Sequence, residues 1–346
     1  MTTNPNTFDP TSTLQALLQG NQLTRDDTKL LFGAMMTGGV EETQIAAVLT
    51  LFAIRDLDPD ELAGAAEIMR QHVTPIPTDI DPVTMLDTAG TGGAPKTFNV
   101  STAAAIVAAA SGIPVAKHGN RSRTGRGSAE VLENLGINIH ASPEVQANCL
   151  KEVGTCFCFA IHHHPATKFV VPVRRALGFP TIFNLLGPLT NPAGARRQLL
   201  GVWDQRFGLL LAEALIRLGS VRAIVAHADD GLDEVSISAP TTLWHVENGT
   251  IREERICPED VGLTTRPIES VTANDLEHAT AMIRSILDGT ERGAPRDMVL
   301  INAGAAMLAA GGVSELSEGV QTAASTIDSG AALETLTNLG NWSRSD

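Results

Sequence analysis

The sequence predicts an α/β protein in which a small all-helical domain, residues 1–75, precedes a larger, mostly parallel α/β domain, residues 80–346. The first seventy-odd residues place apolar side chains at helical spacing and contain no strand-like run. After Asp81-Pro82, short apolar runs alternate with helical stretches. Such alternation is typical of a parallel sheet whose two faces are covered by helices.

Four helices are expected in the first domain. The first covers residues 11–19. Thr24 is a candidate N-cap, with Asp27 three residues later, for a second helix that ends near Gly38-Gly39. Residues 41–55 are apolar at helical spacing, and Asp58-Pro59 begins a fourth helix with proline at its first position.

The larger domain is expected to alternate strands with helices. Strands are predicted at residues 83–87, 113–116, 155–161, 199–203, 221–226 and 235–238. Helices are predicted at residues 102–110, 128–135, 143–153, 205–218, 274–287 and 296–310. A glycine-rich turn separates the first of these strands from the first helix.

Charge is unevenly distributed along the chain. The net charge of −14 argues against a general nucleic-acid binder or a membrane-surface protein. Yet residues 88–129 and 153–203 contain no Asp or Glu. Both segments carry clustered cations: Lys96, Lys117, Arg121, Arg123 and Arg126 in the first, and Lys168, Arg174, Arg175, Arg196 and Arg197 in the second. A buried core would explain the missing carboxylates but not the clustered cations, so these segments are expected to bind an anion.

The remaining composition favours a cytoplasmic location, with no membrane and no nucleic acid as partner. Residues 103–116 form the longest run of small apolar residues, but Ser111, Gly112 and Pro114 interrupt it, and it is too short to span a bilayer. Residues 1–9 are polar and lack the pattern of a secretory signal. The four cysteines show no Cys-x-x-Cys spacing, which is typical of reduced thiols.

A glycine-rich turn, Gly90-Thr91-Gly92-Gly93, follows the first predicted strand. Its glycines let the backbone approach a ligand, so that N–H groups can hold phosphate. Asn99, Ser101 and Thr102 open the next helix, whose N-terminus favours anions. The turn could instead serve only as a tight connection, and no Gly-Lys-Ser/Thr follows to make it a Walker loop.

A second candidate segment is residues 117–127, which begins Lys117-His118-Gly119-Asn120-Arg121-Ser122. Glycine, serine and basic side chains in one loop fit a mobile clamp over phosphate groups. The alternative is an ordinary solvated basic loop, which does not explain the glycine and serine content.

Two adjacent carboxylates stand in Gly231-Leu232-Asp233-Glu234, at a turn after a predicted strand. Such hard oxygen ligands suit Mg²⁺, which proteins commonly bind through one or two carboxylates together with substrate phosphates. An adjacent acidic pair is also common on protein surfaces. The phosphate-type turn elsewhere in the chain favours the metal site.

An apolar run bounded by Pro and Gly, residues 183–192, follows Arg174-Arg175. It could line a pocket for a flat ring that bears a carboxylate, with an arginine as its partner, or it could be a rigid linker. His162-His163-His164 is not expected to bind a metal, because three consecutive side chains do not converge easily on one ion.

Together these segments resemble the anthranilate phosphoribosyltransferase family. The match runs in order over nearly the whole chain: Gly90 to Gly93, Phe98 to Thr102, Lys117 to Ser122, Gly127-Ser128-Ala129, His164-Pro165-Ala166, Thr181 to Ala193, and Gly231 to Glu234. Residues 183–192 are the most family-specific part. The glycine turn and the Lys-His-Gly-Asn segment are shared more loosely with pyrimidine nucleoside phosphorylases.

The resemblance implies a fold of the nucleoside phosphorylase/phosphoribosyltransferase type, with a hinge between the domains and the active site between them. It implies that part of residues 165–195 joins the helical domain in space, and that a homodimer forms through that domain. The implied reaction joins anthranilate to phosphoribosyl pyrophosphate, with Mg²⁺ as cofactor, two ions per subunit.

The resemblance also implies which residues bind each ligand. Phosphoribosyl pyrophosphate is expected at Gly90, Gly93, Ala94, Thr97, Asn99, Val100, Ser101, Thr102, Lys117, His118, Gly119, Asn120, Arg121, Ser122, Arg123, Thr124, Gly125 and Ser128. Anthranilate is expected at Gly90, His118, Asn120, His164, Arg174 and Pro188. Mg²⁺ is expected at Ser101, Asp233 and Glu234, and no residue is expected to act as nucleophile or base.

The chain departs from the family pattern on the pyrophosphate side. Where the family often has Asp after the glycine turn, this chain has Ala94, and both this turn and the basic segment before Gly127 are one residue short. Two other functions are weighed against the family's. A pyrimidine nucleoside phosphorylase-like enzyme would have no use for a carboxylate-binding Arg174. A non-catalytic nucleic-acid-binding relative is disfavoured by the net charge of −14 and by the Asp233-Glu234 pair.

Overall fold

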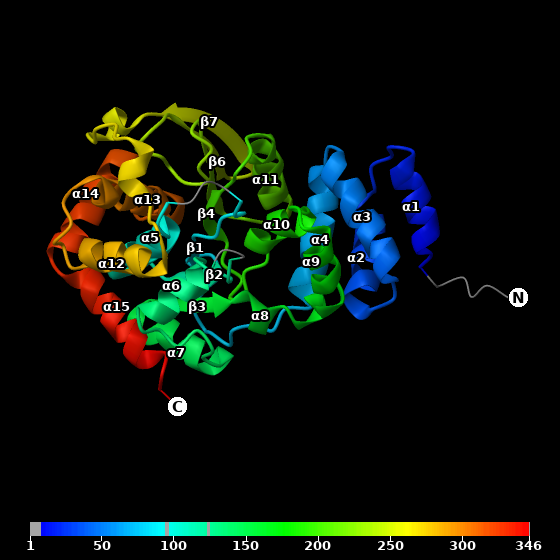
Figure 1. Ribbon diagram of the computed structural model, residues 1–346, viewed down its shortest axis with the longest axis horizontal. Helices are drawn as coiled ribbons and strands as arrows, with labels where there is room; N and C mark the ends of the chain where they lie inside the picture. Colours follow the sequence, from blue (N-terminus) through cyan, green and yellow to red (C-terminus); the bar gives the residue numbers. More distant parts are fainter. Residues whose placement is uncertain (1–7, 94–96, 123–124, 346) are drawn as a thin grey trace, which may run out of the picture.

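A computed structural model describes residues 8–93, 97–122 and 125–345 of the chain. Its N-terminal helices are α1 (Pro10–Leu18), α2 (Arg25–Thr37), α3 (Glu42–Ile54) and α4 (Pro59–Gln71). Local sequence sets their starts: Thr24 accepts a hydrogen bond from the Asp27 N–H, and Asp58 caps α4 ahead of Pro59. The small helical domain expected from the sequence is confirmed (Figure 1).

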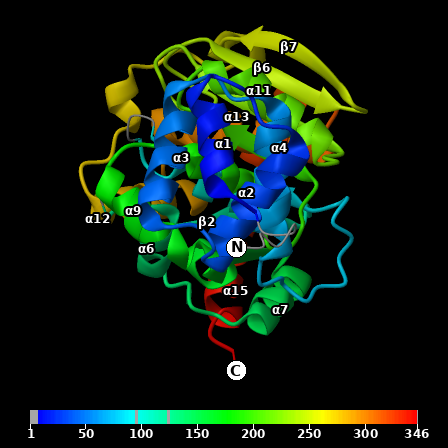
Figure 2. The same cartoon turned by 90° about the vertical axis from the view of Figure 1, so that its right-hand side faces the viewer.

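A segment from the middle of the chain packs onto these helices. It contains η1 (Pro165–Phe169), α9 (Val171–Leu177) and α10 (Ile182–Leu186), followed by η2 (Gly187–Leu189). The Phe183 ring lies 5.8 Å from that of Phe32 on α2, within one apolar core. α9 lies beside the N-terminal helices in both views (Figures 1 and 2). The smaller body of the molecule is therefore built from two distant parts of the sequence.

The larger body contains one seven-stranded sheet in the order β3-β2-β1-β4-β5-β6-β7. Its strands are β1 (Leu86–Asp87), β2 (Val115–Gly119), β3 (Thr155–Phe159), β4 (Arg197–Gly201), β5 (Arg222–Ala228), β6 (Thr241–Glu247) and β7 (Thr250–Ile256). The first five strands pair in parallel, and β6 and β7 form an antiparallel hairpin at one edge. The prediction of a mostly parallel sheet is confirmed.

Three strand predictions are wrong in whole or in part, the first because residues 83–85 precede the short β1 and form no strand. Residues 235–238 form no strand, because the side chain of Asn302 bonds both the N–H and the carbonyl of Val235 at 2.9 and 2.8 Å. Residues 160–161 belong to α8 (Ala160–His163) instead of β3. The β6–β7 hairpin was not predicted, although its turn carries the Asn248-Gly249 pair that favours left-handed backbone, with φ of 51° and 74°.

Helices cover both faces of the sheet. α5 (Val100–Ala110) and α13 (Ala294–Ala310) pack on one face and α11 (Arg206–Arg217) packs on the other. Successive side chains of a strand point to opposite faces of the sheet, so one strand contributes to the apolar core on each face. On β4, Leu199 belongs to one core and Leu200 to the other. The other helices are α6 (Ser128–Asn134), α7 (Pro143–Val153), α12 (Leu276–Leu287), α14 (Leu316–Asp328), α15 (Ala331–Trp342), η3 (Pro258–Val261) and η4 (Ile268–Val271).

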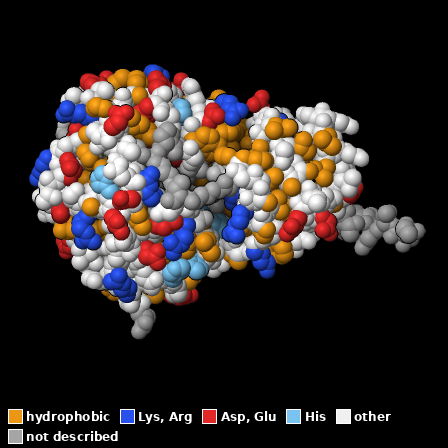
Figure 3. Space-filling view, in the orientation of Figure 1, with side chains coloured by type: hydrophobic (Ala, Val, Ile, Leu, Met, Phe, Trp, Pro, Cys, Tyr) orange, Lys and Arg blue, Asp and Glu red, His pale blue; other side chains and the backbone are white. Residues whose placement is uncertain are grey.

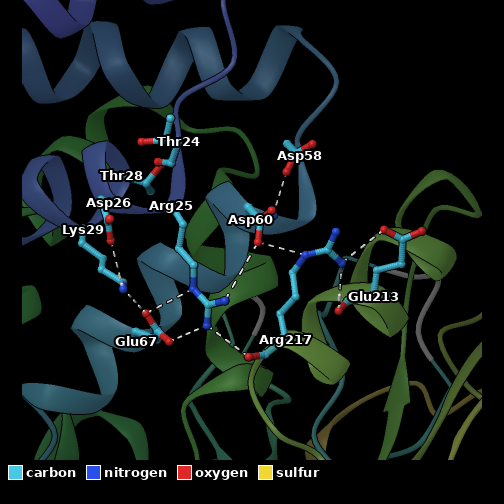
Figure 4. A network of polar contacts seen from close by, with 10 residues as sticks. All are labelled: Thr24, Arg25, Asp26, Thr28, Lys29, Asp58, Asp60, Glu67, Glu213 and Arg217. Atoms are coloured by element: carbon cyan, nitrogen blue, oxygen red, sulfur yellow. Dashed lines mark hydrogen bonds and ion pairs between the residues drawn. The ribbon is translucent and has the colours of Figure 1, made fainter. Parts of the chain in front are cut away.

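A polar network joins the two bodies at the C-terminal end of α11 (Figure 4). Arg25 on α2 donates to the carbonyl oxygen of Arg217 at 3.0 Å and also contacts Glu67. Arg217 in turn donates to Asp60 on α4 at 2.9 Å. Cations are favoured at a helix C-terminus, so this network fixes α2 and α4 against the sheet domain. Among the described helices, none is both long and apolar enough to cross a membrane.

Candidate active site

A cavity of about 770 Å³ lies between the two bodies. The sheet domain lines it with segments at the carboxyl ends of β1, β2, β4 and β5, and the smaller body lines it with α4, η1, α9 and α10. The strand order reverses around β1, and ligands of open α/β sheets bind at such a point. Figure 3 shows the surface hollowed where the bodies meet.

The cavity gathers most of the residues that the sequence singled out. Those lining it are Gly90, Gly93, Thr97, Asn99, Ser101, Lys117, His118, Gly119, Asn120, Arg121, Ser122, Ser128, His164, Arg174, Pro188, Asp233 and Glu234. Val100 and Thr102 do not line it, because their side chains are fully buried in the first turn of α5. Gly125 does not line it either. Ala94, Arg123 and Thr124 lie outside the described residues.

The glycine turn packs against the end of β4 and the acidic pair. Gly92 and Gly93 have φ of 64° and 99°, a backbone region that favours glycine. The N–H and hydroxyl of Thr91 both donate to the Gly201 carbonyl, at 2.9 and 3.1 Å. A Cβ on Gly90 would lie 3.1 Å from Asp233 Oδ2. The turn therefore brings backbone N–H groups and carboxylates to one wall.

Lys117 and His118 lie within strand β2, so the prediction that they belong to a flexible loop is wrong. Parallel pairing with β3 holds Lys117 and His118 in place, so a mobile clamp over phosphate groups could begin only after Gly119. Lys117 Nζ donates to the Thr88 hydroxyl at 3.2 Å and to Ser101 Oγ at 3.3 Å. Burial lowers the pKa of Lys117 to about 8, although Asp87 and Glu234 oppose that shift.

A buried amide–carboxylate pair lies behind this wall. Asn191 Nδ2 donates to Asp87 Oδ2 at 2.9 Å and to the Ala116 carbonyl at 2.7 Å. Asp87 Oδ1 accepts the His118 N–H at 3.0 Å. The pair thus ties β1 and β2 to the segment that includes Pro188. Burial raises the pKa of Asp87 to about 6, and the hydrogen bonds from Asn191 and His118 oppose the rise.

The three consecutive histidines point to three different places. His162 Nε2 lies 2.8 Å from His140 Nδ1 at the surface. His163 bridges the Thr74 carbonyl and Gln146 Oε1, at 2.7 and 2.8 Å. His164 faces the cavity, where its Nε2 lies 3.2 Å from Nε2 of His118.

Asp233 and Glu234 form the acidic wall of the cavity. Burial raises the pKa of both carboxyls, and the charge of Asp233 raises that of Glu234 further. Among the described residues no three His, Cys, Asp or Glu side chains gather as a metal site. The donor set nevertheless fits Mg²⁺, because two hard carboxylates repel each other in a cavity that Ser101 also lines, and Mg²⁺ commonly takes its other ligands from water and phosphate.

The opposite wall carries an arginine beside an aromatic ring. The Arg174 guanidinium lies 5.1 Å from the centre of the Phe183 ring, and Nη2 approaches Asn184 Oδ1 at 3.5 Å. The next residue, Arg175, is exposed and does not line the cavity. A cation beside a flat apolar surface suits an aromatic acid.

Comparison with known proteins identifies the family. Residues 83–333 match the family model for the glycosyl transferase family, a/b domain, and residues 11–73 match its helical bundle domain. An anthranilate phosphoribosyltransferase of Halorhodospira halophila is 45% identical over 331 residues, which cover 95% of this chain and 96% of that protein. The chain belongs to the anthranilate phosphoribosyltransferase family.

Solved structures of this family share the fold. The anthranilate phosphoribosyltransferase of Thermus thermophilus is 38% identical, with a TM-score of 0.90 over 96% of this chain and 99% of that chain. The Saccharomyces cerevisiae enzyme, solved with PRPP and Mg, is 26% identical with a TM-score of 0.88, covering 96% and 97%. In complex with 4-fluoroanthranilate, it matches at 25% identity with a TM-score of 0.86 over the same shares.

Sequence reasoning gave no role to Asn302 or to Thr88, although Thr88 belongs to the segment that leads into the glycine turn. Asn302, on the apolar helix α13, holds the loop after the acidic pair through Val235. Thr88 bonds the Ser101 carbonyl at 3.1 Å and receives Lys117 Nζ. A lone Asn within an apolar helical run was the available signal for Asn302, because a buried amide needs polar partners.

Proposed function

We propose that this protein transfers the phosphoribosyl group of phosphoribosyl pyrophosphate to the amino nitrogen of anthranilate. The products are N-(5-phosphoribosyl)anthranilate and pyrophosphate, in the second step of tryptophan biosynthesis from chorismate. The supporting observation is that one cavity holds a glycine turn, a buried lysine and paired carboxylates on one wall, and Arg174 beside Phe183 on another. The volume of this cavity lies in the usual range for small-molecule sites.

On the sheet side, the cavity residues named from the sequence would hold phosphoribosyl pyrophosphate. The glycine turn and the start of α5 offer N–H groups, and Lys117 and Arg121 offer positive charge. Ser101, Asp233 and Glu234 would hold Mg²⁺, two ions per subunit, and the metal would neutralise the departing pyrophosphate. Gly90, His118, Asn120, His164 and Pro188 would surround anthranilate, and Arg174 would bind its carboxylate.

Positioning and electrostatics supply the stabilisation of the departing charge and the alignment of the substrates in this scheme. The aromatic amine is neutral at pH 7 and can attack ribose C1 without first losing a proton. The protein has to align the amine with the C1–O bond and to stabilise the charge that leaves with pyrophosphate. Aligned substrates and preorganised N–H groups, cations and carboxylates provide both effects.

We also propose how the chain is organised around this reaction. Residues 1–75 with part of 165–195 form one domain, and residues 80–346 form the other. A homodimer forms through the helical domain, a proposal supported by exposed Leu18, Leu30 and Ile54 on α1 to α3. A cytoplasmic location is supported by the unbridged cysteines, of which Cys156 and Cys158 lie with their sulfur atoms 3.9 Å apart.

The test of this function is product identity. The purified protein is incubated with anthranilate, phosphoribosyl pyrophosphate and Mg²⁺, and the products are identified by mass spectrometry. N-(5-phosphoribosyl)anthranilate and an equal amount of pyrophosphate are expected. A parallel incubation with pyrimidine nucleosides and phosphate should release no free base. Base release without conversion of anthranilate would assign the nucleoside phosphorylase reaction instead.

A further inference from the structure

The two cavity histidines form a hydrogen-bonded chain whose proton positions follow from its partners. His118 Nδ1 lies 3.1 Å from the Gly187 carbonyl oxygen, which can only accept, so Nδ1 carries a proton. Burial, followed by the neighbouring His164 and His163, lowers the pKa of His118 well below its ordinary value. The ring is therefore neutral, and its Nε2 has a lone pair. Nε2 of His164, 3.2 Å away, must be the donor.

The remaining nitrogen of His164, Nδ1, therefore keeps its lone pair. Burial, followed by His163, lowers the pKa of His164 to about 4, so this ring is also neutral at pH 7. His164 lines the cavity together with Thr167, Val171 and Arg174, at intervals of three or four residues. The residue that carries this acceptor nitrogen thus lines the same cavity as the arginine assigned to the carboxylate of anthranilate.

We propose, on the basis of the function proposed above, that His164 accepts the proton that the amine loses as the C–N bond forms. His118 holds His164 in the tautomer that can do so. The amine lone pair forms the bond to ribose C1, the C1–O bond breaks, and its electron pair leaves with pyrophosphate. The N–H proton of the amine passes to His164 Nδ1. The imidazolium of His164 that results keeps its hydrogen bond from Nε2–H to Nε2 of His118. Solvent takes the proton after product release.

The surroundings of His118 and His164 favour neutral imidazole rings of low basicity. Lys117 on β2 and His163 on α8 are the neighbouring groups that oppose protonation of the two rings. Asp87 on β1 lies next to His118, where its carboxylate accepts the backbone N–H, and Arg174 on α9 lines the same cavity. Burial, followed by these positive neighbours, keeps both imidazoles unprotonated before the reaction. The arylammonium formed by attack is a far stronger acid than an alkylammonium, so an imidazole of low pKa can still receive its proton.

Chemical rescue of His164→Ala tests this role. The single-turnover rate at saturating substrates is measured by anthranilate fluorescence and should fall about 10²-fold, the lower end for a lost general base. Added imidazole should restore part of the rate, and methylimidazoles of higher pKa should restore more. His162→Ala is the matched control, because His162 is exposed and does not line the cavity. Its rate should equal that of the wild type and should not respond to imidazole.

Three results would overturn the role. A wild-type rate in His164→Ala would assign the proton to the ortho carboxylate of the substrate or to pyrophosphate. A loss that no imidazole restores would make His164 a packing residue. Should the alanine variant not fold, His164→Gln retains a donor for His118, and a wild-type rate in that variant would also contradict proton acceptance. Absence of turnover in the wild type would instead reject the proposed function itself.

Discussion

The carboxylate of Glu234 accepts a hydrogen bond of 3.0 Å from the hydroxyl of Thr97, although 137 residues separate them. This contact joins the loop after β5 to the segment that enters α5. Beside it, Asp233 lies against the glycine turn at Gly90. The proposed metal ligands are therefore held directly against the backbone proposed to bind phosphate.

Replacing Asp233 with Asn and Glu234 with Gln should abolish Mg²⁺-dependent turnover and leave the fold intact. The two partly buried carboxylates repel each other without metal, so the double variant should be at least as stable as the metal-free wild type. Thermal unfolding with and without Mg²⁺ and phosphoribosyl pyrophosphate measures both effects. Stabilisation by the two ligands should occur only in the wild type. Full activity in the double variant would remove the metal assignment.

Arg174→Ala should raise the KM for anthranilate far more than the KM for phosphoribosyl pyrophosphate. The loss should be on the order of 1.5–3 kcal/mol, the usual value of a hydrogen bond to a charged group. Arg175→Ala is the matched control, because Arg175 is exposed and outside the cavity. Steady-state kinetics measure the KM of both variants for anthranilate and for phosphoribosyl pyrophosphate. If only Arg175→Ala weakens anthranilate binding, the wrong arginine has been assigned.

Gly201→Ala should displace the backbone of the turn that carries Asp233 and Glu234. A Cβ at this position would lie 1.6 Å from the Asp233 carbonyl oxygen, so the backbone of the acidic turn has to move. Turnover should fall together with the stabilisation by Mg²⁺. Gly33→Ala is the control, because its Cβ would meet nothing within 4 Å. This change within α2 should stabilise the protein by about 0.5–1 kcal/mol. Normal Mg²⁺ dependence in Gly201→Ala would contradict the contact.

Asn191→Ala should destabilise the protein more at pH 8 than at pH 5. Burial raises the pKa of Asp87 from 3.8 to about 6, so ionised Asp87 opposes folding increasingly as pH rises through that range. Without Asn191 the buried carboxylate loses a donor, so the pKa of Asp87 in the folded variant rises further. The extra loss of stability is therefore small below about pH 6 and grows as pH rises from there towards the pKa of Asp87 in the variant. The destabilisation at pH 8 should be about 2–3 kcal/mol.

Urea unfolding at the two pH values measures this difference. Gln198→Ala is the control, because Gln198 pairs with Asp87 across β1 and β4 but its buried amide donates to the Pro188 carbonyl and not to the carboxylate. Its loss of stability should be the same at both pH values. Equal losses of stability at pH 5 and pH 8 for Asn191→Ala would show that the amide does not stabilise the ionised form of Asp87.

Local signals explain how much of the fold and site could be predicted. Thr24 and Asp58 mark helix starts that the structure confirms, because an N-cap depends only on residues within one turn. The cavity residues after β1 and β5 could be grouped because parallel strands bring their carboxyl ends to one edge. The run at residues 183–192, the most family-specific part of the sequence, predicted the wall of the cavity on which Pro188 lies.

Features set by tertiary packing could not be predicted. Val235 and Ile237 alternate like a strand, but the Asn302 side chain takes the backbone groups of Val235 from a helix 67 residues away. Lys117 and His118 look polar enough for a loop, yet β2 continues through them, and Lys117 bonds Thr88, directly after β1, and Ser101 on α5. Sequence spacing contains no information about such partners.

The most direct test of the central claim is the loss of anthranilate fluorescence on addition of phosphoribosyl pyrophosphate, followed with and without Mg²⁺. Fluorescence should fall only when protein, both substrates and Mg²⁺ are present together, and one pyrophosphate should appear for each anthranilate consumed. The fall should stop when Mg²⁺ is chelated and resume when it is restored. Unchanged fluorescence in the complete mixture, with protein that is folded and able to bind Mg²⁺, would contradict the assigned reaction.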